Sequence, residues 1–299
     1  MPRLPERFQN IFILIFITLS AAFTPIFAKL SVSEISPVSL GFFRFSFAAL
    51  LFLITLKLKK GNLSFDYGDY PRLILLAFLC IPLNQYFFLN GVNKSYASHS
   101  GIIYSLNPVY AYSFAVFLGY EKFYLRKLTA IMLTVIGIIF IFYEGITTAQ
   151  INSDVVTGDV LLLFAVLTFS LYLTLGKNII EKYGALKSSA FIFITGSLLY
   201  VPLFIADAPN LNFGEVSWKG FAGFVYLSVI VAYLAYFIWY YALKTIEISK
   251  LTTMSNISPL LTVLFSIIFL GEKISLLFIT GSMITVTGLI IMHRNNNIN

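Results

Sequence analysis

Apolar runs of about twenty residues recur along the chain and are separated by short polar segments. A helix needs about 20 apolar residues to cross the ~30 Å hydrocarbon core of a bilayer, so each run predicts one membrane-spanning helix. Ten such helices are expected, near residues 10–30, 37–57, 70–90, 97–119, 127–143, 158–180, 187–205, 218–242, 248–270 and 275–292. The pattern therefore predicts an all-α integral membrane protein with no room for a separate soluble domain.

The composition agrees with this prediction. Hydrophobic residues make up 59% of the 299 residues and charged residues only 11%, whereas soluble domains carry about 25% charged residues. The net charge is +7, but the basic residues are scattered in ones, twos and threes between apolar runs. That distribution is typical of charges at membrane edges, so no nucleic-acid partner is expected. With one cysteine and no Cys/His cluster, no metal or other cofactor is expected either.

The positions of Lys and Arg predict the orientation in the membrane, because these residues are enriched in cytoplasmic loops. If the N-terminus is cytoplasmic and the helices alternate, fifteen of the 20 Lys and Arg residues lie on the cytoplasmic side and four outside. Arg44 remains, well inside an apolar run. We therefore expect a multi-pass protein of the cell (inner or plasma) membrane with both termini in the cytoplasm.

A long segment of the first half is repeated in the second. At a constant offset of 151, Ser105–Ile139 overlays Asn256–Ile290 without a gap, and eleven of the 35 positions are identical. The identities include Pro108 with Pro259 and the Glu121-Lys122 pair with Glu272-Lys273. Two unrelated apolar runs would share Leu and Ile by chance, but rarely a proline and a charged pair in register.

The repeat divides the chain into two halves of five helices, residues 1–143 and 156–292, followed by a short cytoplasmic tail at 293–299. Because five is an odd number, equivalent helices of the two halves run in opposite directions through the membrane. Inverted repeats of this kind occur in secondary transporters, where they place a substrate site near the bilayer midplane. The repeat thus predicts alternating access to a central site.

Two segments resemble a known family. "PVSLGFFRFSFAALLF" at residues 37–52 is similar to the second helix of the EamA-like group of the drug/metabolite transporter superfamily, and "FLGEK" at 269–273 is similar to the end of its ninth helix. The resemblance covers roughly residues 10–292. It implies a ten-helix carrier from a family whose substrates include amino acids, other metabolites and drugs.

Polar side chains inside the apolar runs are candidates for the substrate site, because polar groups in hydrocarbon usually face the bundle interior. Asn84 and Gln85 are adjacent and point about 100° apart on a helix, so at least one should face a cavity. Small polar residues also join helices, which is the alternative interpretation for the Asn and Ser candidates. The candidates are Arg44, Asn84, Gln85, Tyr104, Asn107, Tyr233, Tyr236, Asn256 and Ser258.

Arg44 has three interpretations. It could clamp a carboxylate or other anionic group of the substrate. It could also extend along the helix toward the outer headgroups, or bond to helix-end carbonyls of a neighbouring helix.

The repeated acidic and basic pairs, Glu121-Lys122 and Glu272-Lys273, fall at opposite membrane faces. They could form gating ion pairs that break and re-form during transport, although solvated charges at a helix end are the alternative. His99 is expected at the membrane interface. Because all 13 Asp and Glu residues fall in loops or at predicted helix ends, we expect facilitated diffusion or exchange, without a carboxylate that couples transport to protons.

The function predicted from the sequence is secondary transport of a small polar metabolite, such as an amino acid, across the cell membrane by alternating access. An enzyme is not expected, because HExxH, GxSxG and the phosphate-binding GxxxxGK[ST] motif do not occur. A non-transporting receptor or scaffold remains the alternative. The expected partners are a small-molecule substrate and the lipid bilayer, and Gly137 and Gly288 would permit the close helix contact of a homodimer.

Overall fold

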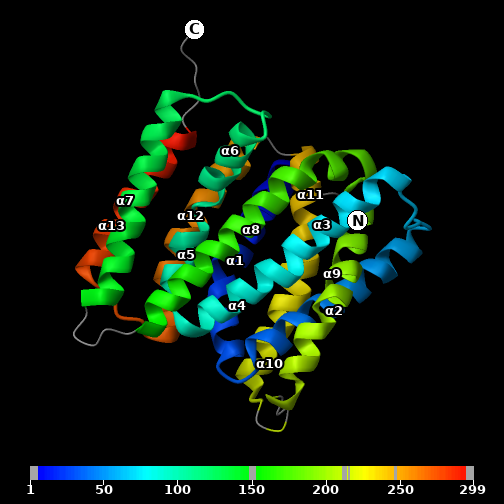
Figure 1. Cartoon of the computed structure of the whole chain (residues 1–299), viewed down its shortest axis with the longest axis horizontal. Helices are drawn as coiled ribbons and strands as arrows, with labels where there is room; N and C mark the ends of the chain where they lie inside the picture. Colours follow the sequence, from blue (N-terminus) through cyan, green and yellow to red (C-terminus); the bar gives the residue numbers. More distant parts are fainter. Residues whose placement is uncertain (1–5, 148–152, 211–213, 215, 246–247, 294–299) are drawn as a thin grey trace.

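The computed structural model describes residues 6–147, 153–210, 214, 216–245 and 248–293, without the side chains of 6, 7, 126, 144–147, 210, 240, 241, 243–245, 248–256 and 293. In this part of the chain every regular element is a helix, and the fold is the predicted bundle of two inverted five-helix repeats (Figure 1). Six of its helical stretches are long and apolar enough to cross a membrane. The uninterrupted spans are α1 (Glu6–Val32), α2 (Pro37–Leu58), α7 (Leu125–Thr147), α8 (Ser153–Tyr183), α9 (Ala185–Asp207), α12 (Ile248–Leu270) and α13 (Leu276–His293).

The third span is interrupted at its centre by a wider turn. It consists of α3 (Tyr70–Phe78), the π-helical segment η2 (Leu79–Leu83) and α4 (Asn84–Lys94), and a 3-10 turn η1 (Tyr67–Asp69) precedes it. Pro82 lies inside η2. Since proline has no backbone N–H, it removes a bond from the helical ladder, and a π turn accommodates the defect.

The fourth and eighth spans are also interrupted. The fourth is divided into α5 (Ala97–Tyr104) and α6 (Asn107–Phe117) by a turn at residues 105–106, and Pro108 stands in the first turn of α6, where its missing N–H is tolerated. The eighth runs as α10 (Trp218–Val225), the π-helical η5 (Tyr226–Ala235) and α11 (Tyr236–Thr245), without a proline. A second 3-10 turn, η3 (Ala208–Asn210), follows α9.

Ten spans place the start of α1 and the end of α13 on the same face, which we call the terminal face; it lies toward the top of Figure 1. The opposite face, called the distal face, carries the connections at residues 33–36, 95–96 and 271–275, together with residues 208–210 and 216–217.

Helices α7 and α13 occupy equivalent places in the two halves and pack against each other at the left edge of Figure 1. Gly137 lies against Gly281 and Thr285, and Gly288 lies against Ala130 and Thr134. These glycines therefore serve a contact inside the chain, where small residues let two backbones approach closely. A homodimer no longer follows from them and stays a prediction.

The repeat also extends into α1 and α8, where a Thr-x-Ser-x-x-x-Thr pattern recurs at an offset of 150. The three hydroxyls of each copy donate to backbone carbonyls three or four residues earlier in their own helix. This lets polar side chains sit in an apolar setting without unmade hydrogen bonds. The residues are Thr18, Ser20 and Thr24 in α1 and Thr168, Ser170 and Thr174 in α8.

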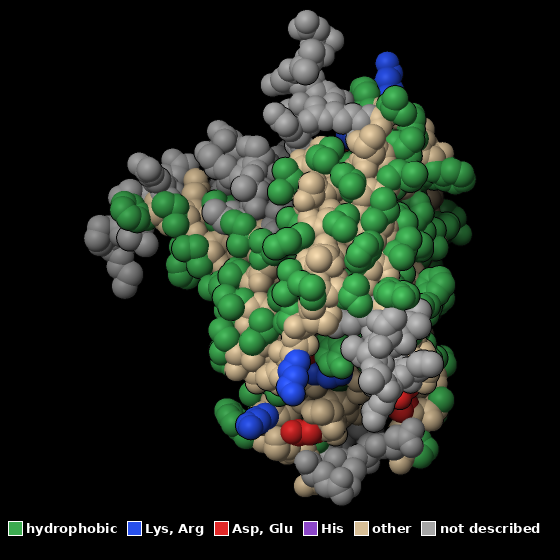
Figure 2. Space-filling view, turned by 90° about the vertical axis from the view of Figure 1, so that its left-hand side faces the viewer, with side chains coloured by type: hydrophobic (Ala, Val, Ile, Leu, Met, Phe, Trp, Pro, Cys, Tyr) green, Lys and Arg blue, Asp and Glu red, His purple; other side chains and the backbone are tan. Residues whose placement is uncertain are grey.

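The side of the molecule formed by α7 and α13 is apolar across its middle, and the Lys, Arg, Asp and Glu side chains visible there gather toward its ends (Figure 2). Met132, Ile139, Met283 and Ile290 are all more than half exposed on these helices. A soluble protein rarely exposes so large an apolar field. This surface is suited to contact with lipid hydrocarbon.

We expect Gly137→Ala to lower the free energy of unfolding by about 1–3 kcal/mol, as overpacking of a tight contact does. An added Cβ would collide with Thr285 Oγ1 and lie 2.5 Å from the carbonyl oxygen of Gly281. Thermal unfolding of the detergent-solubilised protein measures the change. Gly68→Ala is the matched control, because a Cβ at Gly68 meets no atom within 4 Å; equal melting temperatures for both variants would contradict the prediction.

Candidate functional site

Arg44 lies inside the bundle, in the middle of α2, and only 4% of it is exposed. Its Nε donates to the carbonyl of Leu227 in η5 (3.1 Å), and its Nη1 donates to Gln85 Oε1 (2.9 Å). Of the three interpretations of Arg44, extension toward the outer headgroups is therefore wrong, because both bonds turn the guanidinium inward. A bond to a neighbouring carbonyl is present, and that carbonyl belongs to the irregular segment of the eighth span.

The two neighbouring amides continue this chain of hydrogen bonds. Gln85 Nε2 donates to Asn84 Oδ1 (2.6 Å), and Asn84 Nδ2 donates to the Tyr104 hydroxyl (3.1 Å) and to the carbonyl of Ala165 (2.7 Å). Asn84 and Gln85 are both buried. Both amides thus have partners inside the bundle, and the prediction that at least one of them faces a substrate cavity stays a prediction. We call Arg44, Gln85, Asn84 and Tyr104 the polar chain.

The positive charge of Arg44 has no acidic partner among the described residues; its neighbours within electrostatic reach are Tyr236, Tyr104 and Cys80. A guanidinium has five N–H donors, and the two printed bonds use Nε and Nη1. In the described part of the chain Nη2 has no hydrogen-bond partner. The Phe45 ring lies 4.9 Å from the Arg44 Cζ, which compensates the charge only weakly.

The two candidate tyrosines of the eighth span differ in their surroundings. Tyr236 begins α11 and lies close to Arg44. The Tyr233 hydroxyl instead shares a hydrogen bond of 2.5 Å with Thr55 Oγ1, and its ring packs edge-on against Phe52 at 5.0 Å. Tyr233 thus joins η5 to α2, whereas Tyr236 is the candidate tyrosine of this span within electrostatic reach of Arg44.

The remaining candidates lie between helices or outside the described side chains. Asn107 Oδ1 accepts a bond from Ser170 Oγ (2.6 Å), which joins α6 to α8. The carbonyl of Ser258 accepts from Thr262 Oγ1 (3.1 Å), which also donates to Ala22 in α1 (3.0 Å). The Asn256 side chain lies outside the described residues. For Asn107 this contact favours the role of joining helices, whereas at Ser258 it is Thr262, one turn later in α12, that joins this helix to α1.

Neither repeated Glu-Lys pair forms the ion pair that we considered. Glu272 instead accepts bonds from the backbone N–H groups of Ala97 (2.7 Å) and Ser98 (3.0 Å) and from Ser98 Oγ (2.6 Å), so it caps the N-terminus of α5. Lys273 is exposed. Glu121 pairs at 3.3 Å with Lys127, and the carbonyl of Lys122 accepts from the Tyr112 hydroxyl (3.0 Å).

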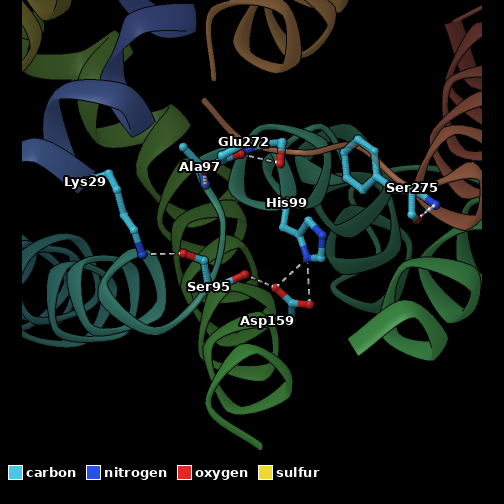
Figure 3. A network of polar contacts seen from close by, with 9 residues as sticks. Lys29, Ser95, Ala97, His99, Asp159, Glu272 and Ser275 are labelled. Atoms are coloured by element: carbon cyan, nitrogen blue, oxygen red, sulfur yellow. Dashed lines mark hydrogen bonds and ion pairs between the residues drawn. The ribbon is translucent and has the colours of Figure 1, made fainter. Parts of the chain in front are cut away.

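A buried acid–base pair adjoins this cap on the distal face (Figure 3). His99 Nδ1 lies 2.9 and 3.1 Å from the two carboxylate oxygens of Asp159, and Ser95 Oγ donates to the same carboxylate. Asp159 is fully buried and His99 is 2% exposed. The ring of Phe278 stacks on His99 at 5.0 Å.

This pair corrects two expectations. His99 lies at the distal end of its span but is buried between helices, where Asp159 and Phe278 enclose it, and is not open to water or headgroups. Asp159 belongs to the second turn of α8 and is removed from water, so a buried carboxylate does exist and the argument against proton coupling loses its premise. Sequence reasoning missed the pairing because the partners lie 60 residues apart on different helices.

Other carboxylates of the distal face also bind helix N-termini. Asp207 accepts from the N–H (3.1 Å) and hydroxyl (2.6 Å) of Ser39 in the first turn of α2. Glu34 accepts from the N–H (2.8 Å) and hydroxyl (2.7 Å) of Ser217, directly before α10. The Ser217 hydroxyl holds the pKa of Glu34 below its ordinary value. In the described residues no group of three or more His, Cys, Asp or Glu side chains could hold a metal ion.

The sequence model of the EamA-like transporter family matches residues 9–143 and 156–294, one match in each half. The chain belongs to the EamA-like transporter family. The resemblance seen at residues 37–52 and 269–273 is thereby confirmed. Since members of this family are transporters, the protein is a multi-pass membrane transporter.

Similar proteins agree with this family assignment. An uncharacterized transporter of Archaeoglobus fulgidus is 26% identical over 265 residues, which cover 88% of this chain and 90% of that protein. The uncharacterized transporter YetK of Bacillus subtilis is 23% identical, with 88% and 80% covered. One solved crystal structure superposes with a TM-score of 0.64 over 96% of this chain and 97% of the other at 14% identity, which shows a shared fold alone.

We expect His99→Ala and Asp159→Ala each to lower the free energy of unfolding of this EamA-like protein by about 3–5 kcal/mol, since each leaves a buried polar partner without its hydrogen bond. The loss of unfolding free energy in the double variant should be clearly smaller than the sum of the losses in the two single variants, because the double variant leaves no unpaired charge. Unfolding of the purified variants by denaturant measures both quantities.

Lys94 and Asp154 provide the matched control on the same face, as an exposed ion pair of 2.8 Å. Alanine at either position should lower the free energy of unfolding by under about 1 kcal/mol, and the two effects should add in the double variant. Additive effects of the same small size at His99 and Asp159 would contradict the assignment of a coupled buried pair.

Proposed function

We propose that this protein is a secondary transporter that moves a small polar metabolite, an amino acid or a related carboxylate, across the cell membrane by alternating access. The observation that carries the proposal is the buried guanidinium of Arg44 at the centre of the bundle, without an acidic partner among the described residues. A buried cation is costly in a membrane unless an anion or a polar cavity compensates it.

A carboxylate of the substrate is the anion that fits this position. Arginine binds carboxylates through two parallel N–H···O bonds, and Nη2 together with the Nη1 now bound to Gln85 presents such a pair of donors. We infer that the substrate carboxylate replaces Gln85 Oε1 on Nη1. The released amide of Gln85 and the hydroxyls of Tyr104 and Tyr236 then lie around the rest of the ligand.

The arrangement of the polar chain supports alternating access. Its side chains come from spans two, three and four, while the carbonyls at its two ends, Leu227 and Ala165, belong to spans eight and six of the other half. A ligand held here therefore lies between the inverted repeats, which is where such transporters bind their substrates. Relative motion of the halves would expose this position to one face and then to the other.

We assign the terminal face to the cytoplasm. The Lys and Arg residues are concentrated in the connections of that face, as the positive-inside rule requires. Glu121 then belongs to a cytoplasmic gate and Glu272 to an outer gate. The non-transporting scaffold stays as the alternative outcome of the experiment below.

The test is counterflow into proteoliposomes with a labelled pool of amino acids, organic acids and the matching carboxamides, with and without a pH gradient. The wild type should exchange carboxylate members in preference to their carboxamides. Arg44→Gln should lower the carboxylate counterflow at least about tenfold, because a charge-assisted pair is worth about 1.5–3 kcal/mol.

Arg72→Gln is the matched control, since Arg72 also donates two hydrogen bonds to a helix carbonyl, that of Leu175, but lies at the terminal face. It should keep the counterflow of the wild type. If Arg44→Gln shows the same carboxylate counterflow as the wild type, Arg44 does not bind the substrate. Absence of counterflow for every member of the pool in the wild type would favour the scaffold.

A further inference from the structure

The buried pair of His99 and Asp159 joins the two repeats at the distal face (Figure 3). His99 stands in the first turn of α5, which belongs to the fourth span and the first half. Asp159 stands in the second turn of α8, which is the first span of the second half. The pair therefore lies where the distal ends of the two halves must separate if this face opens. Neither residue belongs to the polar chain.

The hydrogen-bond donors around Asp159 indicate that its carboxyl group is ionised. Ser95 Oγ donates to Oδ1, and His99 Nδ1 lies 3.1 Å from Oδ1 and 2.9 Å from Oδ2. An ionised carboxylate only accepts hydrogen bonds, so Nδ1 must carry the hydrogen of this contact. The charge of the imidazole then depends on its second nitrogen. Without a proton on Nε2 the pair carries one net negative charge, and with that proton it is neutral overall.

The other charges at this corner of the described structure do not balance the carboxylate. Lys29 donates to three carbonyls at the end of the third span and attracts Glu272, whose carboxylate caps α5. Lys94 pairs with Asp154 at 2.8 Å on the surface. Lys273 is exposed, where solvent screens its charge. The net charge of the buried pair is therefore decided by its own proton.

The packing around the pair leaves no room for hydrating water. Phe278 stacks on the imidazole at 5.0 Å, and Tyr96 lies edge-on to it at 5.2 Å. On the side of α8, a Cβ at Gly158 would lie 2.6 Å from the backbone nitrogen of Ser95, so the two backbones touch. A net charge is costly in such surroundings, whereas a carboxylate paired with an imidazolium has none. The closed arrangement therefore favours the protonated pair.

One side chain separates His99 from the solution at the distal face. Tyr96, which directly precedes α5, contacts the imidazole and is 41% exposed. On the other side, Ile102 and Ile103 in the next turn of α5 are fully buried and apolar. A proton therefore reaches the pair from the distal side, past Tyr96, and not from the interior of the bundle.

We propose that His99 and Asp159 form a proton-binding site that holds the distal face closed. The pair takes up one proton from the distal solution, on Nε2 of His99, and returns it when the face opens and water hydrates both groups. Because the closed state binds this proton more tightly than the open state, a lower pH favours the closed face and a higher pH favours the open face. The opening rests on the alternating access of the proposed function, whereas the binding of the proton does not.

Nitrogen NMR of the imidazole ring tests the proton directly. The chain has two histidines, so His293→Gln leaves His99 as the single imidazole of the whole protein in lipid nanodiscs. The ring nitrogen shifts should be those of an imidazolium at about pH 7, and Asp159→Asn should change them to those of a neutral imidazole at the same pH. A neutral imidazole over the whole range from about pH 5 to 9, with Asp159 intact, would contradict the proposal.

Spin-label distances in the same nanodiscs test the effect on the distal face. Asn93→Cys and Leu276→Cys place labels at exposed positions in the two halves. Raising the pH from about 6 to about 9 should shift the ratio of open to closed distal faces about tenfold toward open, because a charge-assisted hydrogen bond is lost. Cys80 is buried, so protein with this cysteine alone serves as the labelling control.

Asp159→Asn and His99→Gln keep hydrogen-bonding groups at both positions and should reduce this pH-dependent shift to under about twofold. Asp154→Asn is the matched control, because it removes an exposed carboxylate from the first turn of the same helix and should leave the shift intact. A full shift in both pair variants, or opening at low pH, would contradict the proposal. The NMR measurement keeps the test valid if a pair variant fails to fold.

Neither measurement uses a substrate, so the two proposals can fail separately. Opening that depends on pH, without counterflow of any member of the labelled pool, would contradict the proposed function and leave the proton site standing. Counterflow in a protein whose distal distances do not change with pH would contradict the proton site and leave the proposed function standing.

Discussion

In hydrocarbon no water is present to satisfy a backbone N–H or C=O, so each interruption of a spanning helix needs a partner from within the protein. The other polar features of this fold depend on that constraint. Arg44 meets the carbonyl of Leu227 in a π-helical segment, Glu272 meets the first N–H groups of α5, and Lys29 meets the last carbonyls of α4. These three charged side chains thus supply hydrogen bonds to backbone groups that lie at helix ends or in an irregular helical segment.

A charged side chain that binds backbone groups uses its hydrogen-bonding capacity there, whereas one that binds a ligand must have capacity left. Lys29 and Glu272 each make three bonds at a helix end, so most of their hydrogen-bonding capacity is used. Asp159 has a titratable partner and a hydroxyl donor. Arg44 has only neutral acceptors, and one of its bonds goes to a side-chain amide that can rotate away. That difference is why we propose Arg44, and not the other three, as the charge that binds a ligand.

The spans, their inverted repetition and the family could be predicted from the sequence, because apolar length and an ungapped repeat are properties of the chain itself. Pro82 and Pro108 also marked two of the three interruptions, but the π segment at residues 226–235 has no proline to indicate it. The side-chain partners could not be predicted. Glu272 lies 175 residues from Ala97, and Asn84 and Gln85 satisfy each other only because the fold turns both amides toward Arg44 and Tyr104.

The two copies of the repeated segment show how far a local sequence determines structure here. Pro108 stands at the start of a new helix after a turn, whereas Pro259, its counterpart, lies inside the continuous helix α12. Both prolines lack the same backbone donor, so the proline alone does not decide whether the span breaks. The residues around the two prolines also differ, since only eleven of the 35 aligned positions are identical. Two related segments therefore form a broken span in one half and a continuous span in the other, so the inverted repetition predicted from the sequence does not extend to the course of each helix.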